Sequence, residues 1–185
     1  MITSLASGDR PSRSARVPAE VFPGVTGESA TTATLAACED APVTPDEIIE
    51  SLDLRPHPEG GQYVETWRGA DGPDGRSVGT AIYYLLRAGE RSHWHRVDAT
   101  ELWLFHAGGP ITIDVADDHG NAERTLLGPD IAGGERPQLV IAAGAWQTAT
   151  PMGSWTLVSC IVTPGFEFEG FELAPAGWQP GSPLG

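Results

Sequence analysis

The segment from Gly89 to Gly108 contains the residues of this chain best suited to chemistry. It carries His93 and His95 and, a few residues later, Glu101. Side chains alternate along a strand, so His93 and His95 are expected on one face of a strand, with Glu101 projecting from the next strand toward them. An imidazole and a carboxylate that converge in this way could hold a divalent metal, or could act together as general base and general acid.

Neighbouring segments offer further residues for a pocket around this pair. Tyr84 is expected to face the pocket and to donate a proton to a developing oxyanion. Small-molecule sites are mainly apolar, with a few polar groups that fix the ligand. The residues assigned to substrate contact are His93, Gln147, Trp103, Phe105, Glu65 and Gln62. Glu59 is expected to face solvent, and Cys160 to be an inert core residue.

The elements that must position these residues are short extended segments separated by turns. The chain has 23 glycines and 16 prolines, and turn sequences such as DGPDG and DDHGN stand between runs of alternating apolar residues. In ITIDV, for example, Ile111 and Ile113 share one face and Thr112 lies on the other. Many short strands at close spacing predict an all-β sandwich or barrel.

The N-terminal part of the chain is different. Residues 1–43 are rich in Ser, Thr, Ala, Pro and Gly without periodicity, which predicts an extended or disordered arm ahead of a domain over 44–185. A short helix is expected to begin at Thr44, where Pro45 and Glu47 complete a capping box, and to end before Pro56. The C-terminal run PGFEFEGFE is interpreted as a structural strap or edge strand.

The order of these residues resembles the first motif of the cupin superfamily. Gly89, His95, Glu101 and Gly108 stand in register with that motif, but Val97 occupies the position of its second histidine. The second motif is represented by three residues, with an amide in place of its histidine. These are Ala142, Gly144 and Gln147. The resemblance implies an all-β double-stranded β-helix, or jelly-roll barrel, in which two of the four usual metal ligands are replaced.

Longer runs make the resemblance more specific. The segments HPEGG, AIYYLL, SHWHRV, PQLVIAAGAWQ and TPGFEFEGFELA, spanning roughly residues 51–174, are similar to one largely uncharacterised cupin family. That family in turn resembles deoxysugar epimerases of the same fold, a likeness of architecture. If a metal is held, its ligands are expected to be His95 and Glu101 together with Gln147 or His93, which could supply the missing nitrogen. The metal would be Zn, Ni, Fe or Mn; no cofactor is certain from the residues.

The composition of the chain excludes some classes of binding partner. The formal net charge of −14 and eleven scattered arginines without any lysine disfavour nucleic acid and anionic membranes. The absence of a long apolar run or a signal-like N-terminus favours a cytoplasmic protein. The two cysteines, Cys38 and Cys160, do not indicate a disulfide framework. Cupin barrels commonly pair through their sheet edges, so a homodimer is expected.

These observations leave three hypotheses open. The first is an enzyme that moves protons on a small polar organic molecule, as an isomerase, epimerase, cyclase or lyase, with His95 as base and Glu101 orienting it or donating the proton. The second is a metal-dependent enzyme that uses the ion as Lewis acid or oxygen activator. The third is a non-catalytic module that binds a small ligand in the same pocket.

Overall fold

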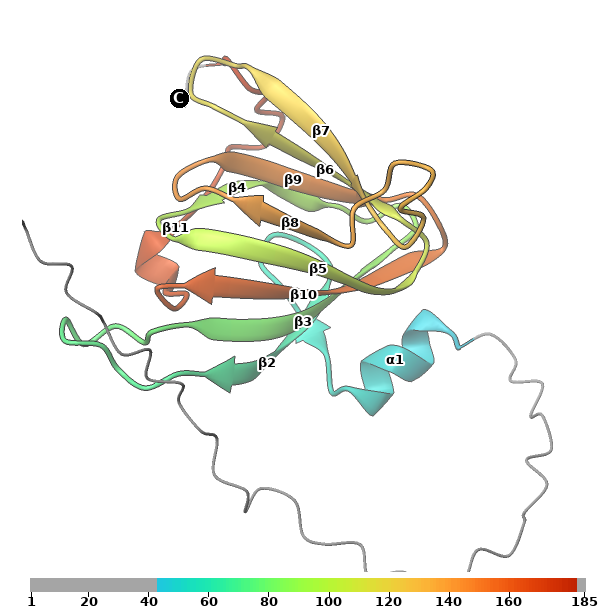
Figure 1. Ribbon diagram of the computed structural model, residues 1–185, viewed down its shortest axis with the longest axis horizontal. Coiled ribbons are helices and arrows are strands. Elements are labelled where there is room, and N and C mark those ends of the chain that lie inside the picture. Colours follow the sequence, from blue (N-terminus) through green and yellow to red (C-terminus); the bar gives the residue numbers. More distant parts are fainter. Residues whose placement is uncertain (1–42, 183–185) are drawn as a thin grey trace, which may run out of the picture. The chain divides into compact units, whose positions relative to one another are not determined.

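The computed structural model describes residues 43–182 (Figure 1). The predicted arm over 1–43 therefore lies outside the described residues, apart from Val43. Helix α1 (Pro45–Ser51) begins where the sequence predicted, with Thr44 and Glu47 forming a complete capping box. It packs on β3 through Ile48, which is buried against Leu85. No helix within residues 43–182 is long and apolar enough to cross a membrane.

Two antiparallel sheets make up the rest of the described chain, which confirms the predicted all-β jelly-roll class. The six-stranded sheet has the order β1-β2-β3-β10-β5-β8, and the five-stranded sheet has the order β11-β4-β9-β6-β7. The strands of the first are β1 (Arg55–Pro56), β2 (Gln62–Arg68), β3 (Thr80–Arg87), β5 (Thr100–Gly108), β8 (Gln138–Ile141) and β10 (Trp155–Thr163). Those of the second are β4 (Ser92–Val97), β6 (Ile111–Ala116), β7 (Ala122–Leu127), β9 (Trp146–Pro151) and β11 (Phe171–Leu173), which follows the short 3-10 helix η1 (Phe168–Gly170).

The inner faces of the two sheets share one apolar core. Leu86 and Val158 contribute from the six-stranded sheet, and Ile111 and Ile113 from the five-stranded sheet, each at most 1% exposed. This placement confirms the alternation expected in ITIDV. Close packing fills one part of the interior, and the remaining part is a cavity lined from both sheets.

An irregularity in β4 decides which histidine faces inward. Ser92 pairs with Ala149 and His95 with Gln147, so β4 advances by three residues where β9 advances by two. The extra residue is a β-bulge, which interrupts side-chain alternation. Ser92 and His95 are consequently both buried, whereas His93 is exposed. The prediction that His93 and His95 share a face was therefore wrong, because strict period-two alternation does not hold across a bulge.

Candidate active site

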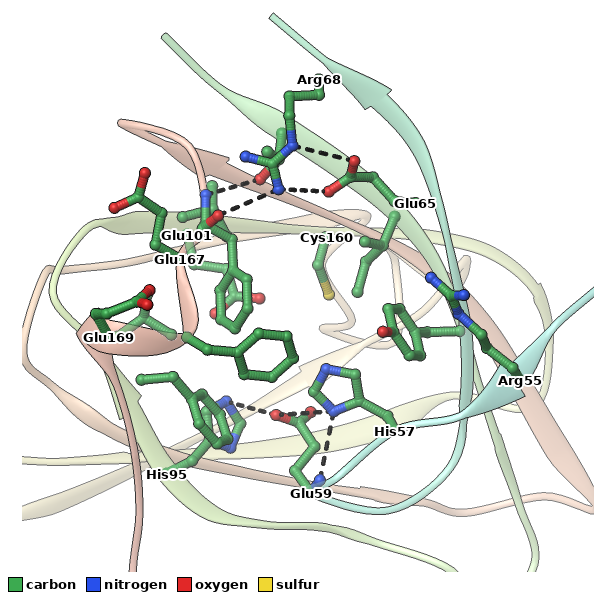
Figure 2. Close-up of a pocket in the computed structure, with 18 residues that line it drawn as sticks. Arg55, His57, Glu59, Glu65, Arg68, His95, Glu101, Cys160, Glu167 and Glu169 are labelled. Atoms are coloured by element: carbon green, nitrogen blue, oxygen red, sulfur yellow. Dashed lines mark hydrogen bonds and ion pairs between the residues drawn. The ribbon is translucent and has the colours of Figure 1, made fainter. Parts of the chain in front are cut away.

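The cavity has a volume of about 350 Å³ and three chemically distinct zones. Its inner end carries titratable side chains, its middle is apolar and aromatic, and its mouth is charged (Figure 2). The inner residues are His57, Glu59, His95, Glu101 and Cys160, and the mouth residues are Arg55, Glu65, Arg68, Glu167 and Glu169. His95 and Glu101 thus line one cavity from adjacent segments, β4 and β5, which is the placement expected from the sequence.

The imidazole of His95 is fixed by hydrogen bonds on one side and faces a carboxyl group on the other. Its Nδ1 lies 2.8 Å from the carbonyl oxygen of His93, which can only accept, so Nδ1 carries the proton. The other ring nitrogen, Nε2, lies 3.3 Å from Oε2 of Glu59. His95 is 2% exposed. The neutral ring therefore presents a lone pair on Nε2 toward Glu59.

Glu59 is a site residue that the sequence interpretation missed. It is 6% exposed rather than solvent-facing, and its carboxyl group lies between the rings of His57 and His95 (Figure 2). Its Oε2 is 3.6 Å from Nδ1 of His57, and its Oε1 accepts a hydrogen bond from the Ser92 hydroxyl at 3.0 Å. Glu59 is therefore the nearest carboxyl partner of His95, a role that had been given to Glu101.

The tight loop that carries Glu59 explains its inward position. Gly60 and Gly61 follow it with φ values of +113° and +68°, a region that L side chains rarely adopt. A side chain at Gly60 would collide with the carbonyl oxygen of Arg91, and one at Gly61 would lie 2.7 Å from the carbonyl oxygen of Leu85. The two glycines let the HPEGG loop press against strand β3 and the segment before β4. The Gly-Gly pair was the sequence signal for this close approach.

Tyr84 anchors the same loop. Its hydroxyl donates to the carbonyl oxygen of Gly60 at 2.7 Å, and the residue is 1% exposed. Tyr84 is not among the residues that line the cavity. The structure thus places it behind the site, where it holds the loop that carries Glu59, instead of at the substrate as expected.

Glu101 belongs to a second buried network. Nε2 of Gln147 donates to its Oε2 at 2.5 Å, and the indole N–H of Trp103 donates to Oε1 of Gln147 at 3.1 Å. The indole nitrogen is a donor only, so it fixes the orientation of the amide. Gln147 and Trp103 are each 1% exposed and position Glu101 from behind the cavity wall. Both were expected to contact substrate.

Burial shifts the pKa values of the inner histidines and glutamates in opposite directions. It lowers the pKa of His95 from 6.5, although the nearby Glu101 and the hydrogen bond to the His93 carbonyl group oppose this shift. It also lowers the pKa of His57, where Glu59 opposes the shift. Burial raises the pKa of Glu59 and of Glu101 above 4.5; neighbouring imidazoles oppose both shifts, and Glu59 adds to the shift at Glu101. The inner end therefore favours neutral side chains over charged ones.

The motif residues do not fit a metal. With its amide oxygen held by Trp103, Gln147 turns its NH₂ group toward Glu101, and an amide NH₂ has no lone pair for a cation. Val97 lines the cavity with an apolar side chain at the other motif position. Within residues 43–182, no group of three His, Cys, Asp or Glu side chains is arranged to hold a metal ion. Of the three ligands assigned, His95 and Glu101 remain, and they contact other protein groups.

The C-terminal run forms a wall and part of the mouth of the cavity, beyond the structural role expected for it. Phe166, Phe168 and Phe171 all line the cavity, and their rings meet edge to face at centroid distances of 5.1 to 6.3 Å. The ring of Phe171 also lies 5.5 Å from that of His95. Between these aromatic residues, Glu167 and Glu169 face the mouth.

The remaining predicted residues divide between the cavity and other positions. Glu65 lines the mouth, where it binds Arg68 in a bidentate ion pair at 2.7 and 3.2 Å. Gln62, Phe105 and His93 are not among the cavity-lining residues. Phe105 packs against the apolar core, and His93 faces outward beside Trp94. Cys160 is buried, as expected, but it also lines the cavity beside Glu101.

A family model described as "Cupin superfamily (DUF985)" matches residues 46–174. The chain belongs to this cupin family. No curated protein sequence matches the chain.

Solved structures support the assignment. Protein SO0799 from Shewanella oneidensis is 42% identical, with a TM-score of 0.66, over 70% of this cupin chain and 83% of that one. A hypothetical protein from Leishmania major is 33% identical, with a TM-score of 0.65, over 70% and 86% of the two chains. Oxalate decarboxylase from Bacillus subtilis is 12% identical, with a TM-score of 0.51, over 66% of this chain and 30% of its own. The last likeness is one of fold alone.

Proposed function

We propose that this cupin is an enzyme that moves a proton between its His95–Glu59 pair and a small polar organic substrate in the cavity. The observation that carries the proposal is the 3.3 Å approach of His95 Nε2 to Glu59 Oε2 at the inner end of a cavity large enough for a small ligand. Perturbed acid–base groups that share a cleft are the usual arrangement for general acid–base catalysis.

The pair is built to accept and return one proton. Because Nδ1 of His95 donates to the His93 carbonyl group, Nε2 is the ring atom that gains or loses a proton. Burial lowers the pKa of His95 and raises that of Glu59, so the two shifts oppose the usual order of proton affinity of an imidazole and a carboxyl group. A proton taken from a substrate carbon can then pass between the two groups.

Glu101 supplies a second proton-carrying group in the same cavity, from a different strand. Burial raises the pKa of its carboxyl group, although the hydrogen bond from Gln147 opposes this shift. Two such groups in one cavity allow removal of a proton by one and delivery by the other, as isomerisation, epimerisation, cyclisation and lyase reactions require. The reaction class is proposed on this chemistry alone.

Deuterium exchange tests the proposal without knowledge of the natural substrate. The full chain is incubated in D₂O with hydroxyketones, aminoketones and reducing sugars, and exchange at carbon is followed by NMR. We expect exchange with at least one compound, reduced on the order of 100-fold or more by His95→Gln or Glu59→Gln.

The matched control is Glu50→Gln, since Glu50 is exposed on α1. It should leave the exchange rate unchanged. Equal rates for Glu59→Gln and the wild type would contradict the proposal, as would absence of exchange with every compound.

A further inference from the structure

We infer that the cavity takes a cationic ligand, a small organic amine with an apolar or aromatic body. The inference rests on the proposed function only in that it names the ligand class of the same site. Its first support is the charge of the groups at the inner end. Two carboxyl groups, Glu59 and Glu101, line this end, and the arginines among the described lining residues lie at the mouth instead.

Glu101 is the stronger of the two anchors. It is 6% exposed and lines the cavity, and within residues 43–182 it forms no ion pair with an arginine. Its close polar partners, the amide of Gln147 and the thiol of Cys160, carry no positive charge. Burial alone favours the neutral acid, so a carboxylate at this position needs a cationic partner. An ammonium group entering the cavity would supply that partner and stabilise the charged form.

The cationic side chains of the lining are confined to the mouth. Arg68 is already engaged, because its guanidinium binds both oxygens of Glu65 and the carbonyl oxygen of Phe166. Arg55 lies over the ring of Tyr63, with its guanidinium carbon 5.3 Å from the ring centroid. An anionic group at the inner end would thus meet carboxyl groups and neutral imidazoles without a compensating charge.

The middle zone of the cavity suits the remainder of such a ligand. Phe166, Phe171 and Tyr63 offer aromatic faces, and Ile82 and Val162 add apolar surface. Aromatic faces attract ammonium groups as well as apolar groups. This wall is independent of the carboxyl groups and favours the same ligand, one with a positive head and an apolar body.

The mouth would attract such a ligand from solution. Glu167 and Glu169 border the opening, and the chain as a whole has a formal net charge of −14. A negative field at the entrance raises the local concentration of cations and lowers that of anions, an effect that salt weakens.

Three probes of matched size test the inference by calorimetry on the full chain: 2-phenylethylamine, 2-phenylethanol and phenylacetate. We expect the amine to bind on the order of tenfold more tightly than the alcohol. The acid should bind more weakly than the alcohol. Glu101→Gln should reduce the preference for the amine to about threefold or less, whereas Glu50→Gln should preserve it.

A second variant tests the inference without changing the buried residue Glu101. Glu169→Gln changes an exposed residue at the mouth, so the protein should fold, and amine affinity should fall about two- to threefold at low salt. Equal affinity for amine and alcohol, preference for the acid, or no binding of the three probes at millimolar concentration would overturn the inference. Carbon-proton exchange could still occur in that case, so the deuterium-exchange experiment tests the proposed function separately.

Discussion

Nε2 of His95 and Oε2 of Glu59 lie 3.3 Å apart, although the two residues come from a bulged strand and from a glycine-rich loop. The carbonyl oxygen of His93 fixes the opposite side of the imidazole, so the lone pair of Nε2 faces the carboxyl group. Neither residue would face the other in a regular strand pairing. The catalytic pair proposed here is thus produced by two departures from regular β structure.

The tautomer of His95 is the first testable consequence. We expect Nδ1 to be protonated and Nε2 to be unprotonated at pH 7 to 8, because the His93 carbonyl group can only accept a hydrogen bond. Nitrogen-15 NMR of the histidine rings distinguishes the two tautomers. The ring should gain its second proton only below pH 6.5, since burial lowers its pKa. An Nε2–H tautomer would contradict the geometry.

Glu101 should leave a signature in the pH dependence of stability. Its pKa is raised by burial, so between pH 4.5 and that raised value the folded state binds more protons than the unfolded state. The contribution of Glu101 to stability is present below pH 4.5 and is lost as the pH rises through this window. Glu101→Gln removes that loss, so the free energy of unfolding of the variant relative to wild type should increase with pH.

Urea unfolding between pH 4.5 and 8 measures this change, which we expect to be on the order of 1 kcal/mol. His57 and His95 act with the opposite sign, because their lowered pKa values reduce stability as the pH falls below 6.5. The effect of His57 is present in both proteins, whereas in the variant His95 loses the Glu101 charge that opposes its lowered pKa, which adds to the increase with pH. Glu50→Gln, which removes an exposed carboxyl group of α1 away from the cavity, is the matched control for the loss of a carboxyl group.

The glycine loop provides a prediction on stability. Gly60→Ala places a methyl group against the carbonyl oxygen of Arg91 at a φ of +113°, so both collision and backbone strain oppose it. We expect a loss of about 1–3 kcal/mol in the free energy of unfolding. Gly134→Ala is the control, since Gly134 has a φ of +97° with no atom within 4 Å of the added carbon. If both variants lose the same amount, the close approach to Arg91 contributes nothing.

Regular patterns allowed much of this fold to be predicted. The capping box at Thr44 and Glu47 and the alternation of Ile111 and Ile113 follow from local chemistry and from period-two geometry. The shared cavity of His95 and Glu101 agrees with their positions in the cupin motif.

The predictions that were wrong share a physical cause. His93 turns outward because the β4 bulge adds one residue, and Glu59 turns inward because two glycines adopt positive φ values. Neither the position of a bulge nor the path of a loop follows from alternation. The inward role of Phe166 depends on contacts between segments far apart in the sequence, which local patterns do not encode.

Tyr84 allows the loop anchor to be tested separately from the chemistry. Tyr84→Phe removes the hydroxyl that donates to the Gly60 carbonyl group at 2.7 Å and leaves a poorly solvated acceptor behind. We expect a loss of about 1–2 kcal/mol in the free energy of unfolding, measured with urea. Because the HPEGG loop carries both His57 and Glu59, the ring resonances of His57 should also shift in NMR spectra.

Tyr83→Phe is the matched control, because Tyr83 is the neighbouring residue on β3 and is only partly buried. It should change the free energy of unfolding by less than about 0.5 kcal/mol and leave the His57 resonances in place. A Tyr84→Phe variant that matches this control in both measurements would show that the loop keeps its position without the hydroxyl. Loss of carbon-proton exchange in Tyr84→Phe with an unchanged His57 spectrum would instead point to a direct effect of the hydroxyl on the carboxyl group of Glu59.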